Sequence, residues 1–345
     1  KNDQPPVIKN EIKETNWETI FDSYYSTTQD NLDPTFNING WISSYTLQLI
    51  EHEAMHEWVD DTVKRIMQLK PQHVLEVGCG TGLLLNKIAP FTQSYWGTDL
   101  SKNALSHIRK TLKKSKHPID HIHLMKQDTN LIPLPKDNAF DCCIINSVCQ
   151  YFPSINTLRS YLEQVLPKIK PNGYFFIGDI RHIGLDALFH SDVVLHHAQT
   201  QHRLIDLHFL TQQRITHDHE LRIHPAFFLA LPKQFPAIQN VEIQLKTGQY
   251  MNEMTQFRYD VILHCNTQAY QHTTLPSYTL SDQLTQHTLQ KIVQDHPNGI
   301  TFCNRPHHRL IAMAKKWDIP DKTDSQNRRF FPEVTTSGTP RIKKR

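Results

Sequence analysis

The sequence predicts an α/β fold in which a doubly wound parallel sheet is covered by helices on both faces. From Gln72 onward, short apolar runs alternate with amphipathic helical segments, a pattern typical of parallel strands joined by helices. The first of these runs ends in a cluster of glycines, and polar side chains follow three of the later runs. Ligands bind at the carboxyl ends of the strands in such sheets. The same pattern therefore predicts a ligand site.

Seven segments have the composition of strands. Five belong to the alternating region, and two strands with alternating polar and apolar residues follow a long insert. The predicted strands span residues 73–77, 94–98, 121–126, 140–147, 173–180, 240–246 and 257–264. Helices are predicted near residues 83–90, 102–114 and 156–169, between most of the first five strands. We therefore expect one sheet made of residues 72–180 and 240–264.

The glycine cluster follows the first predicted strand directly. Glycines stand at 78, 80 and 82, and a helix-forming run begins at Leu83. Glycine reaches positive φ without strain, and the missing side chain lets the backbone approach a ligand closely. The cluster therefore predicts a tight turn that holds a ligand, although such a turn can also be purely structural.

The spacing of these glycines narrows the choice of ligand. A dinucleotide fingerprint needs a glycine where this chain has Leu83 or Leu85, so a nicotinamide cofactor is disfavoured. The next predicted strand ends in Asp99, whose carboxylate could accept hydrogen bonds from both hydroxyls of a ribose. A ligand that contains a ribose is therefore expected.

The run Glu76-Val77-Gly78-Cys79-Gly80-Thr81-Gly82 resembles motif I of the class I S-adenosylmethionine-dependent methyltransferases. The resemblance implies a Rossmann-like methyltransferase sheet with S-adenosyl-L-methionine as cofactor. It also implies an acidic residue near the adenine amino group, for which Asp128 is the match, and a motif IV at Asn146. The residues assigned to the cofactor are Glu76, Gly78, Gly80, Gly82, Asp99, Leu100, Asp128, Thr129, Asn146 and Ser147.

A narrower resemblance comes from four segments outside motif I. Residues 39–46, 146–154, 176–181 with 189–190, and 252–261 together look like the methyltransferase domains embedded in nonribosomal peptide synthetases. The resemblance implies N-methylation of an amino acid, or of an aminoacyl group carried as a thioester on a carrier protein, with synthetase modules as partners. Carrier-protein and adenylation motifs are not found in the sequence, so we expect an excised domain or a freestanding relative.

The same matches suggest residues for the acceptor. His190 and Glu253 are the candidate catalytic residues, because an amine that arrives protonated needs a nearby base. A hydrogen-bonded structural role explains each of them about as well. The residues assigned to the substrate pocket are Tyr25, Tyr45, Tyr151, Arg181 and Arg258. Aromatic residues at helical spacing are more often plain core, which is the alternative for the tyrosines.

The segments outside the sheet divide the chain further. We expect a flexible lead-in over residues 1–16, a helical cap over 17–71, a methyltransferase domain over 72–265 with a helical insert at 181–236, an extension over 266–317 with helices near 282–295 and 306–317, and a disordered basic tail over 318–345. Residues 17–60 and 185–230 are expected to close over the strand ends as a lid.

Charge and cysteine usage restrict the class of protein. The net charge of +3 equals the excess in the tail, where seven Lys/Arg face four Asp/Glu, so the body is neutral and a broad nucleic-acid surface is not expected. None of the six cysteines forms a Cys-x-x-Cys pair, which favours a reducing compartment. No apolar run approaches the ~20 residues that cross a bilayer. We therefore expect a soluble cytoplasmic protein without a membrane partner.

Histidine is unusually frequent, with 22 residues against 11 glycines. Many lie in the insert, where no pair has His-Glu-x-x-His spacing, so structural or solvated histidines are favoured over a metal site in that segment. Two classes of function stay open. One is a methyltransferase, acting on an amine or, as a freestanding enzyme, on an oxygen or carbon of a small molecule; the other is a non-catalytic relative that only binds cofactor.

Overall fold

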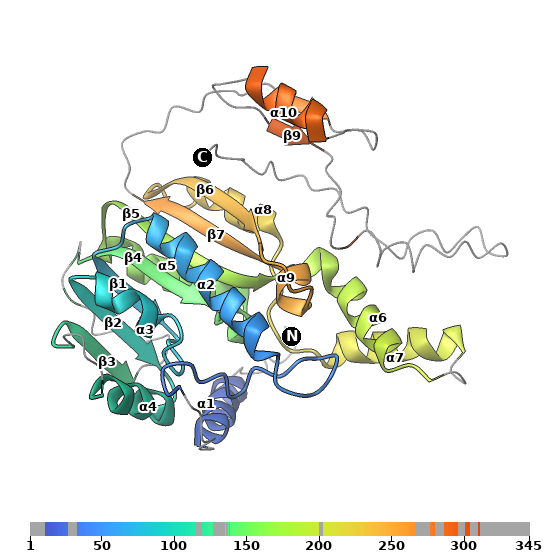
Figure 1. Cartoon of the computed structure of the whole chain (residues 1–345), viewed down its shortest axis with the longest axis horizontal. Coiled ribbons are helices and arrows are strands. Elements are labelled where there is room, and N and C mark those ends of the chain that lie inside the picture. The colour runs from blue at the N-terminus through green and yellow to red at the C-terminus, as the bar shows by residue number, and fades with distance from the viewer. Residues whose placement is uncertain are drawn as a thin grey trace, which may run out of the picture. The chain divides into compact units, whose positions relative to one another are not determined.

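The computed structural model describes residues 11–26, 33–114, 119–126, 135, 137, 139–199, 203–265, 277–279, 286–295, 301–303 and 310 (Figure 1). The chain divides into two compact units, residues 1–178 and 179–345. The strand that joins them, β5, crosses this boundary. Each unit is built around part of the sheet.

All seven predicted strands are present and form one sheet in the order β3-β2-β1-β4-β5-β7-β6. The strand order reverses between β1 and β4, both of which pair in parallel with their neighbours. β6 and β7 are antiparallel to each other. The bounds are β1 His73–Val77, β2 Ser94–Asp99, β3 Ile122–Lys126, β4 Phe140–Asn146, β5 Ile169–Arg181, β6 Ile238–Leu245 and β7 Arg258–Cys265.

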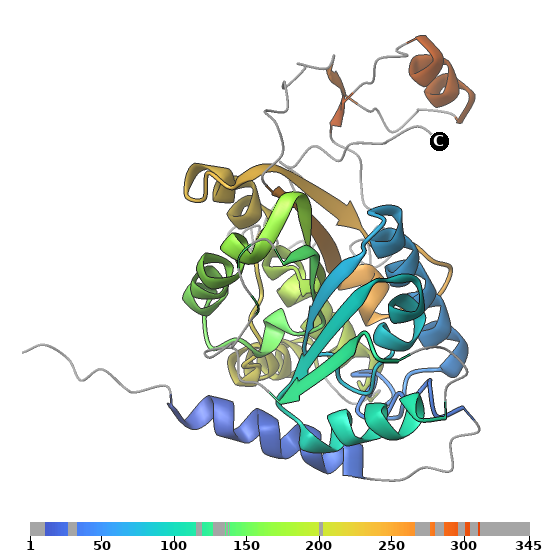
Figure 2. The ribbon, with the colours of Figure 1, turned by 90° about the vertical axis from the view of Figure 1, so that its left-hand side faces the viewer.

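The first unit holds β1 to β4 and most of β5, with helices before and between them. Its helices are α1 Glu11–Ser26, α2 His52–Gln68, α3 Leu85–Ile88, α4 Lys102–Leu112 and α5 Ile155–Val165, and its short 3-10 turns are Ala89–Phe91, Cys149–Tyr151 and Leu166–Lys168. In Figures 1 and 2, α1 runs beside α4, and α2 packs beside α3. The predicted N-terminal helical cap is thus confirmed by α1 and α2.

The apolar runs that predicted the strands form the core of the first unit. In β4, residues 142–145 are fully buried, which is expected for a parallel strand covered on both faces. Five cysteines, Cys79, Cys142, Cys143, Cys149 and Cys265, are free and buried. They pack as small core residues.

Two predicted helices are shorter than expected because prolines interrupt them. The helix predicted for residues 83–90 spans only Leu85–Ile88 and passes into a 3-10 turn that contains Pro90. The helix predicted for residues 156–169 ends at Val165, one residue before a 3-10 turn that contains Pro167. Proline lacks the amide hydrogen that an α-helix needs and clashes with the preceding turn.

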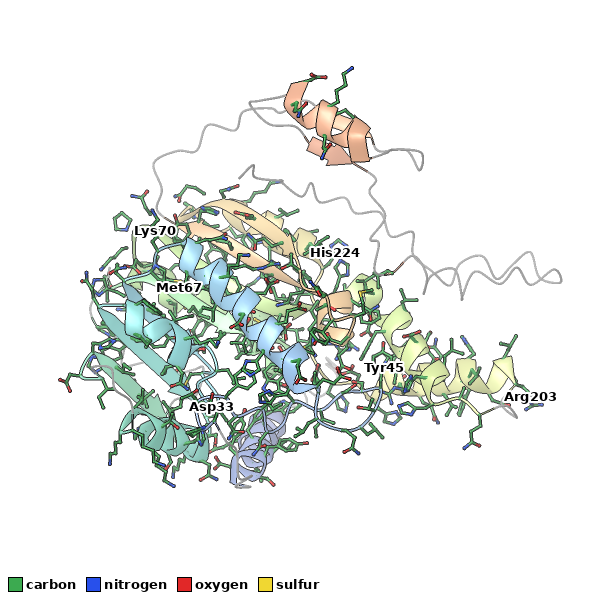
Figure 3. All side chains as sticks on the ribbon, viewed as in Figure 1. Asp33, Tyr45, Met67, Lys70, Arg203 and His224 are labelled. Carbon is green, nitrogen blue, oxygen red and sulfur yellow. The ribbon has the colours of Figure 1, made fainter. Side chains whose placement is uncertain are left out.

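The second unit contains the predicted helical insert. Between β5 and β6 lie the helices α6 Asp186–His196, α7 Leu204–His217 and α8 Pro225–Ala230, with 3-10 turns at Ile183–Leu185 and Leu231–Lys233. α6 packs beside α7 (Figure 1). At the exposed start of α7, the backbone nitrogen of Arg203 (Figure 3) donates a hydrogen bond to Oδ2 of Asp206 at 3.1 Å. The short helix α9, Glu253–Phe257, connects β6 to β7.

Three further elements follow β7. The strands β8 Ser277–Thr279 and β9 Thr301–Cys303 pair in parallel, and α10 Gln286–Asp295 lies between them in sequence. α10 agrees with the helix predicted at 282–295, whereas the one predicted at 306–317 lies outside the described residues apart from Leu310. Among the described helices, none is long and apolar enough to span a membrane.

Candidate functional site

The glycine loop between β1 and α3 adopts a backbone conformation that favours glycine. Gly78, Gly80 and Gly82 have φ values of +68°, +52° and +88°. A Cβ atom on Gly78 would lie 2.3 Å from Cγ2 of Val148, while one on Gly80 would lie 3.5 Å from the Tyr25 hydroxyl. The loop therefore needs glycine at 78 both for its conformation and for close packing.

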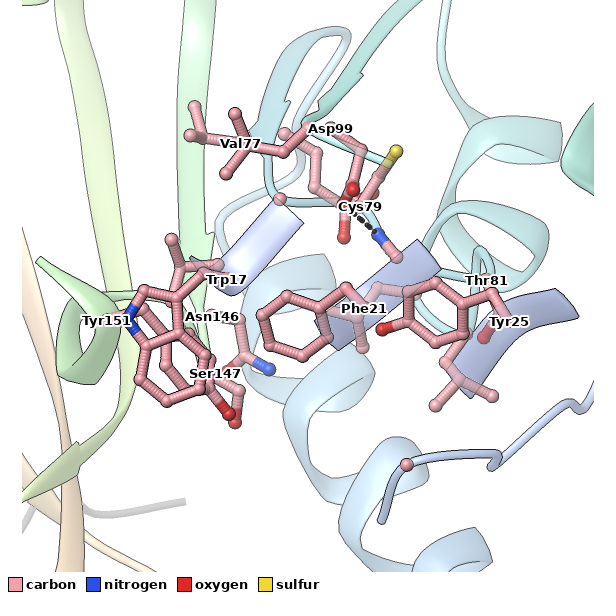
Figure 4. Close-up of a pocket in the computed structure, with 18 of the residues that line it drawn as sticks. Trp17, Phe21, Tyr25, Val77, Cys79, Thr81, Asp99, Asn146, Ser147 and Tyr151 are labelled. Atoms are coloured by element: carbon pink, nitrogen blue, oxygen red, sulfur yellow. Dashed lines mark hydrogen bonds between the residues drawn. The ribbon is translucent and has the colours of Figure 1, made fainter. Parts of the chain in front are cut away.

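Asp99, the last residue of β2, faces this loop. Its Oδ2 accepts a hydrogen bond from the backbone nitrogen of Gly80 at 2.8 Å, and its Oδ1 accepts one from the backbone nitrogen of Ser101 at 2.8 Å (Figure 4). Burial raises the pKa of Asp99, although these backbone bonds oppose the rise. Each carboxylate oxygen has a second lone pair, so both can still accept a hydrogen bond from a hydroxyl group of a ligand.

Glu76 supplies a second carboxylate from the strand before the loop. Its side chain is buried, and its Oε2 accepts a hydrogen bond from the hydroxyl of Tyr95 at 2.7 Å. Burial raises the pKa of Glu76 to about 7, because the charged form loses its hydration. A positively charged ligand beside Glu76 would favour the ionised form.

The loop and the two carboxylates line one cavity of about 170 Å³ in the first unit (Figure 4). Within the described part of the chain, the residues around this cavity include Glu76 and Asp99 but no lysine, arginine or histidine. Much of the remaining wall is aromatic. Its aromatic members are Trp17, Phe21, Tyr25, Trp41, Trp58, Tyr151 and Phe152. Such a cavity suits a partly apolar ligand that carries positive charge.

Asn146 and Ser147 close the cavity at the end of β4. Asn146 is buried, and its Oδ1 has no hydrogen-bond partner among the described residues. A buried amide oxygen without a partner is costly unless a ligand or water donates to it. Its position beside the cavity therefore fits a ligand that carries a hydrogen-bond donor.

The predicted cofactor residues are largely brought together. Those that line the cavity are Glu76, Gly78, Gly80, Asp99, Leu100, Asn146 and Ser147. Gly82 belongs to the same loop but does not line the cavity, and a Cβ there would lie 3.1 Å from Cγ1 of Ile108. Asp128 and Thr129 lie outside the described residues. These assignments remain predictions, since they concern ligand contacts.

The predicted pocket tyrosines separate in the structure. Tyr25 and Tyr151 line the cavity, whereas Tyr45, in the loop before α2 (Figure 3), does not. Burial and the nearby charge of Asp99 raise the pKa of Tyr25. Tyr25 thus lies on the same side of the cavity as Asp99, the carboxylate expected to bind a ribose. Sequence reasoning missed Trp17, Phe21 and Trp58 as wall residues, although the four-residue spacing of 17, 21 and 25 was a usable signal.

The second unit holds the remaining predicted site residues, and Arg258 belongs there to a network of ion pairs. Arg258 donates to Asp179 at 2.6 Å, and Lys246 lies 2.7 Å from Asp260 and 3.3 Å from Asp179. Asp179 and Asp260 are fully buried. Two cations thus balance two buried carboxylates beside β5, β6 and β7, and these contacts account for Arg258 without a ligand.

Arg181 belongs to a separate ionic cluster on α6 and the segment after α7. Asp186, His190 and Asp218 bring potential metal-ligating atoms within 4.8 Å of one another. However, Arg181 lies 3.0 Å from Asp186 and 2.6 Å from Asp218, and Arg222 lies 3.0 Å from Asp186. Glu220 also lies 2.8 Å from Arg181, so the two guanidinium groups and His190 together pair with three carboxylates. The cluster is therefore complete as an ion-pair network and supports no metal proposal.

His190 is buried within this cluster. Its Nε2 lies 3.1 Å from Oδ2 of Asp218 and 3.5 Å from Oδ1 of Asp186. Burial lowers the pKa of His190, but hydrogen bonds and charges from the two carboxylates outweigh burial and raise it above 6.5. The second predicted catalytic residue, Glu253, is the buried first residue of α9, which Asn252 caps.

Comparison with known proteins shows similarity to methyltransferase domains and to peptide synthetases. Residues 75–175 match a methyltransferase domain family. The chain is 38% identical over 247 residues to chondramide synthase of Chondromyces crocatus, and 34% identical over 260 residues to a probable nonribosomal peptide synthetase of Salinispora arenicola. These alignments cover 72% and 75% of this chain but only 6% and 3% of the relatives. The chain thus spans a small part of their length.

A solved structure has a similar fold but a much lower sequence identity. The N-methyltransferase NodS from Bradyrhizobium japonicum, in complex with S-adenosyl-L-homocysteine, has 14% identity and a TM-score of 0.44, covering 72% of this chain and 97% of its own. That likeness is too distant to support an assignment by itself. The family match and the sheet topology show a class I methyltransferase domain that contains residues 75–175 and takes S-adenosyl-L-methionine as its cofactor. Among such proteins it resembles the domains embedded in nonribosomal peptide synthetases.

Proposed function

We propose that the chain transfers a methyl group to the amine of an amino acid or of a carrier-bound aminoacyl thioester, in the assembly of a peptide natural product. The observation that carries this proposal is the similarity, over roughly three quarters of the chain, to segments of peptide synthetases. Carrier proteins and synthetase modules are part of the proposal as partners.

The cavity in the first unit is the proposed cofactor site. When bound, S-adenosyl-L-methionine supplies an electrophilic methyl group. Asp99 would accept hydrogen bonds from the ribose hydroxyls, and Glu76 would offset positive charge. The backbone at Gly78 and Gly80 lets the ligand approach without obstruction by a side chain. The aromatic wall would exclude water and orient the bound groups, which is most of what a methyl transfer asks of a protein.

The two candidate bases differ in how well their surroundings suit the role. A base must be unprotonated at the working pH, but the carboxylates around His190 raise its pKa and so hold its proton. We therefore propose a positioning role for His190 through its pairs with Asp186 and Asp218. Glu253 is the better candidate to accept a proton from an ammonium group, because a carboxylate oxygen can serve as a general base.

The proposal is tested by offering the purified chain S-adenosyl-L-methionine together with free amino acids and aminoacyl thioesters, both carrier-bound and as small thioester analogues. Mass spectrometry should show a product heavier by one methylene, with fragments that locate the methyl group on nitrogen. A product methylated only on oxygen or carbon would contradict the amine as acceptor. Cofactor binding without any product from this panel would favour a non-catalytic role.

A second measurement separates the two candidate residues. If Glu253 is the base, the rate deficit of Glu253→Gln should shrink as pH rises and the amine loses its proton unaided. The deficit of His190→Gln should not follow the deprotonation of the amine, once folding is verified at each pH. Equal, pH-independent deficits in both variants would remove the base role from Glu253.

A further inference from the structure

We propose that Asp22 of α1 is a positioning residue that links the aromatic wall of the cavity to the carboxylate of Asp99, so that cofactor binding and the docking of α1 stabilise each other. The inference rests on the proposed cofactor site. Asp22 is an addition to the residues of that site, because it lies outside both the glycine loop and the strand ends. The link is a short chain of hydrogen bonds within the first unit.

Asp22 ties α1 to the start of α4 through three hydrogen bonds. Its Oδ1 accepts one from the hydroxyl of Ser101 and another, at 3.3 Å, from the backbone nitrogen of Asn103. The side-chain amide of Asn103 also donates a hydrogen bond, to the backbone carbonyl of Asp22 at 3.1 Å. Both the side chain and the backbone of this α1 residue are therefore held, which accounts for the position of α1 next to α4 (Figure 2).

Ser101 is the junction between this anchor and the cofactor carboxylate. It is fully buried, and its backbone nitrogen donates to Oδ1 of Asp99 at 2.8 Å. Its hydroxyl also caps α4 by accepting a hydrogen bond from the backbone nitrogen of Ala104 at 3.0 Å. Asp99 in turn binds the glycine loop at Gly80. A displacement of Asp22 is thus passed to the carboxylate through one buried residue.

The helix face next to Asp22 forms part of the cavity wall. Trp17, Phe21 and Tyr25 recur every four residues and all line the cavity (Figure 4). The rings of Trp17 and Phe21 lie 4.6 Å and 5.0 Å from that of Tyr151, which belongs to the turn after β4. Apart from Asp22, α1 has a second charged contact in Glu18 with Lys126, and it is exposed on both sides. Such a pair contributes little, so of these two charged residues Asp22 is the stronger anchor of this wall.

The direction of the coupling follows from these contacts. A ligand held by Asp99 and covered by the aromatic side chains restrains both ends of the chain of hydrogen bonds, so it should slow the opening of α1. Conversely, a chain without the Asp22 anchor must order α1 when the ligand binds, which weakens binding. Substitution of Asp22 by asparagine keeps an acceptor oxygen and removes only the charge.

The test is calorimetric titration with S-adenosyl-L-homocysteine, combined with hydrogen exchange of residues 17–25 with and without that ligand. In the wild type the ligand should slow exchange across this segment. In Asp22→Ala the dissociation constant should rise roughly tenfold, as for the loss of one hydrogen bond to a charged group, and the slowing should largely vanish. Asp22→Asn should retain most of both effects. Asn103→Ala should weaken both by a smaller factor.

Two comparisons distinguish positioning from a general loss of stability. Asp60→Ala removes an exposed ion pair, in which Asp60 of α2 lies 2.7 Å from Lys87 of α3. This substitution should change neither the dissociation constant nor the hydrogen exchange of residues 17–25. In the Asp99→Ala background, adding Asp22→Ala should weaken binding by much less than tenfold, because the residue through which it acts is gone.

The coupling is overturned if folded Asp22→Ala, or Asn103→Ala should the former fail to fold, binds as tightly as wild type and shows the same ligand-dependent protection of α1. Fully additive effects of Asp22→Ala and Asp99→Ala would also overturn it. In each of these cases the cofactor site itself survives. A wild type that binds no S-adenosyl-L-homocysteine would overturn both the proposed function and the coupling.

Discussion

The carboxylate of Asp99 accepts a hydrogen bond from the backbone nitrogen of Gly80 at 2.8 Å, which ties the end of β2 to the loop that follows β1. The two strands are parallel neighbours, with Val77 opposite Thr98 in register. The acidic strand end and the glycine loop therefore meet at one edge of the sheet. This junction is the basis on which the cavity is interpreted as a cofactor site.

Gly78→Ala is expected to destabilise the chain by about 1–3 kcal/mol, because its new Cβ would lie 2.3 Å from Cγ2 of the stiff, β-branched Val148. Gly80→Ala is expected to cost less, since its nearest contact is 3.5 Å and only the positive φ is strained. Chemical denaturation without ligand measures both. Adding Val148→Ala should recover part of the Gly78→Ala loss; a loss unchanged by it would show that the clash is not the cause.

Lys246→Ala is expected to lower the free energy of unfolding by about 3–5 kcal/mol, because it leaves the buried carboxylate of Asp260 without its cation. Arg203→Ala is the matched control. It breaks the exposed pair with Asp206 and should have no measurable effect on urea denaturation. Similar midpoints for the two variants would contradict the importance of the buried network.

The His190 cluster predicts a pH dependence of stability. The pKa of His190 is raised above 6.5 in the folded chain, so its contribution is complete below about pH 6.5 and is lost as pH rises through the folded pKa. The His190 hydrogen bond and the charge of Arg181 outweigh burial and hold the pKa of Asp218 well below its usual value, so its contribution is lost only in strong acid. Denaturation series should show a fall on the alkaline side that His190→Gln flattens. An identical slope in both proteins would remove His190 as its source.

Glu76 predicts a pH dependence of cofactor binding. Burial raises its pKa to about 7, so the folded chain without ligand loses stability as pH rises from the ordinary value of 4.5 through 7. A ligand with positive charge favours the ionised carboxylate, and its affinity should therefore increase as pH passes 7. Glu76→Gln should abolish that increase in titrations with S-adenosyl-L-methionine. If the affinity of the wild type does not change with pH, the positive charge of the ligand does not lie beside Glu76.

The strands were predictable because each one is a short apolar run bounded by clear breaks. β1 matches residues 73–77 in full, and β2 extends the prediction by one residue, Asp99. β5 begins at Ile169, four residues earlier than predicted, because Pro171 and Gly173 make the first part of this strand look like a turn. Local composition therefore gives the type of element better than its ends.

The contacts of the charged residues could not be predicted in this way. Arg258 and Asp179 are far apart in sequence, and only the folded sheet brings them within 2.6 Å. The same holds for Asp22 and Ser101. Sequence spacing could suggest an aromatic stripe at Trp17 and Phe21, but it could not show that this stripe faces the glycine loop, because that depends on where α1 docks.

The most direct test of the cofactor site is calorimetric titration of wild type and Asp99→Ala with S-adenosyl-L-homocysteine. Asp137→Ala, which breaks an exposed pair with Lys168, serves as the control. We expect the wild type and the control to bind alike. Asp99→Ala should lose about 1.5–3 kcal/mol, roughly ten- to a hundredfold in affinity, because hydrogen bonds to a charged group are removed. Unchanged affinity in a folded Asp99→Ala protein would contradict the assignment of this cavity to the cofactor.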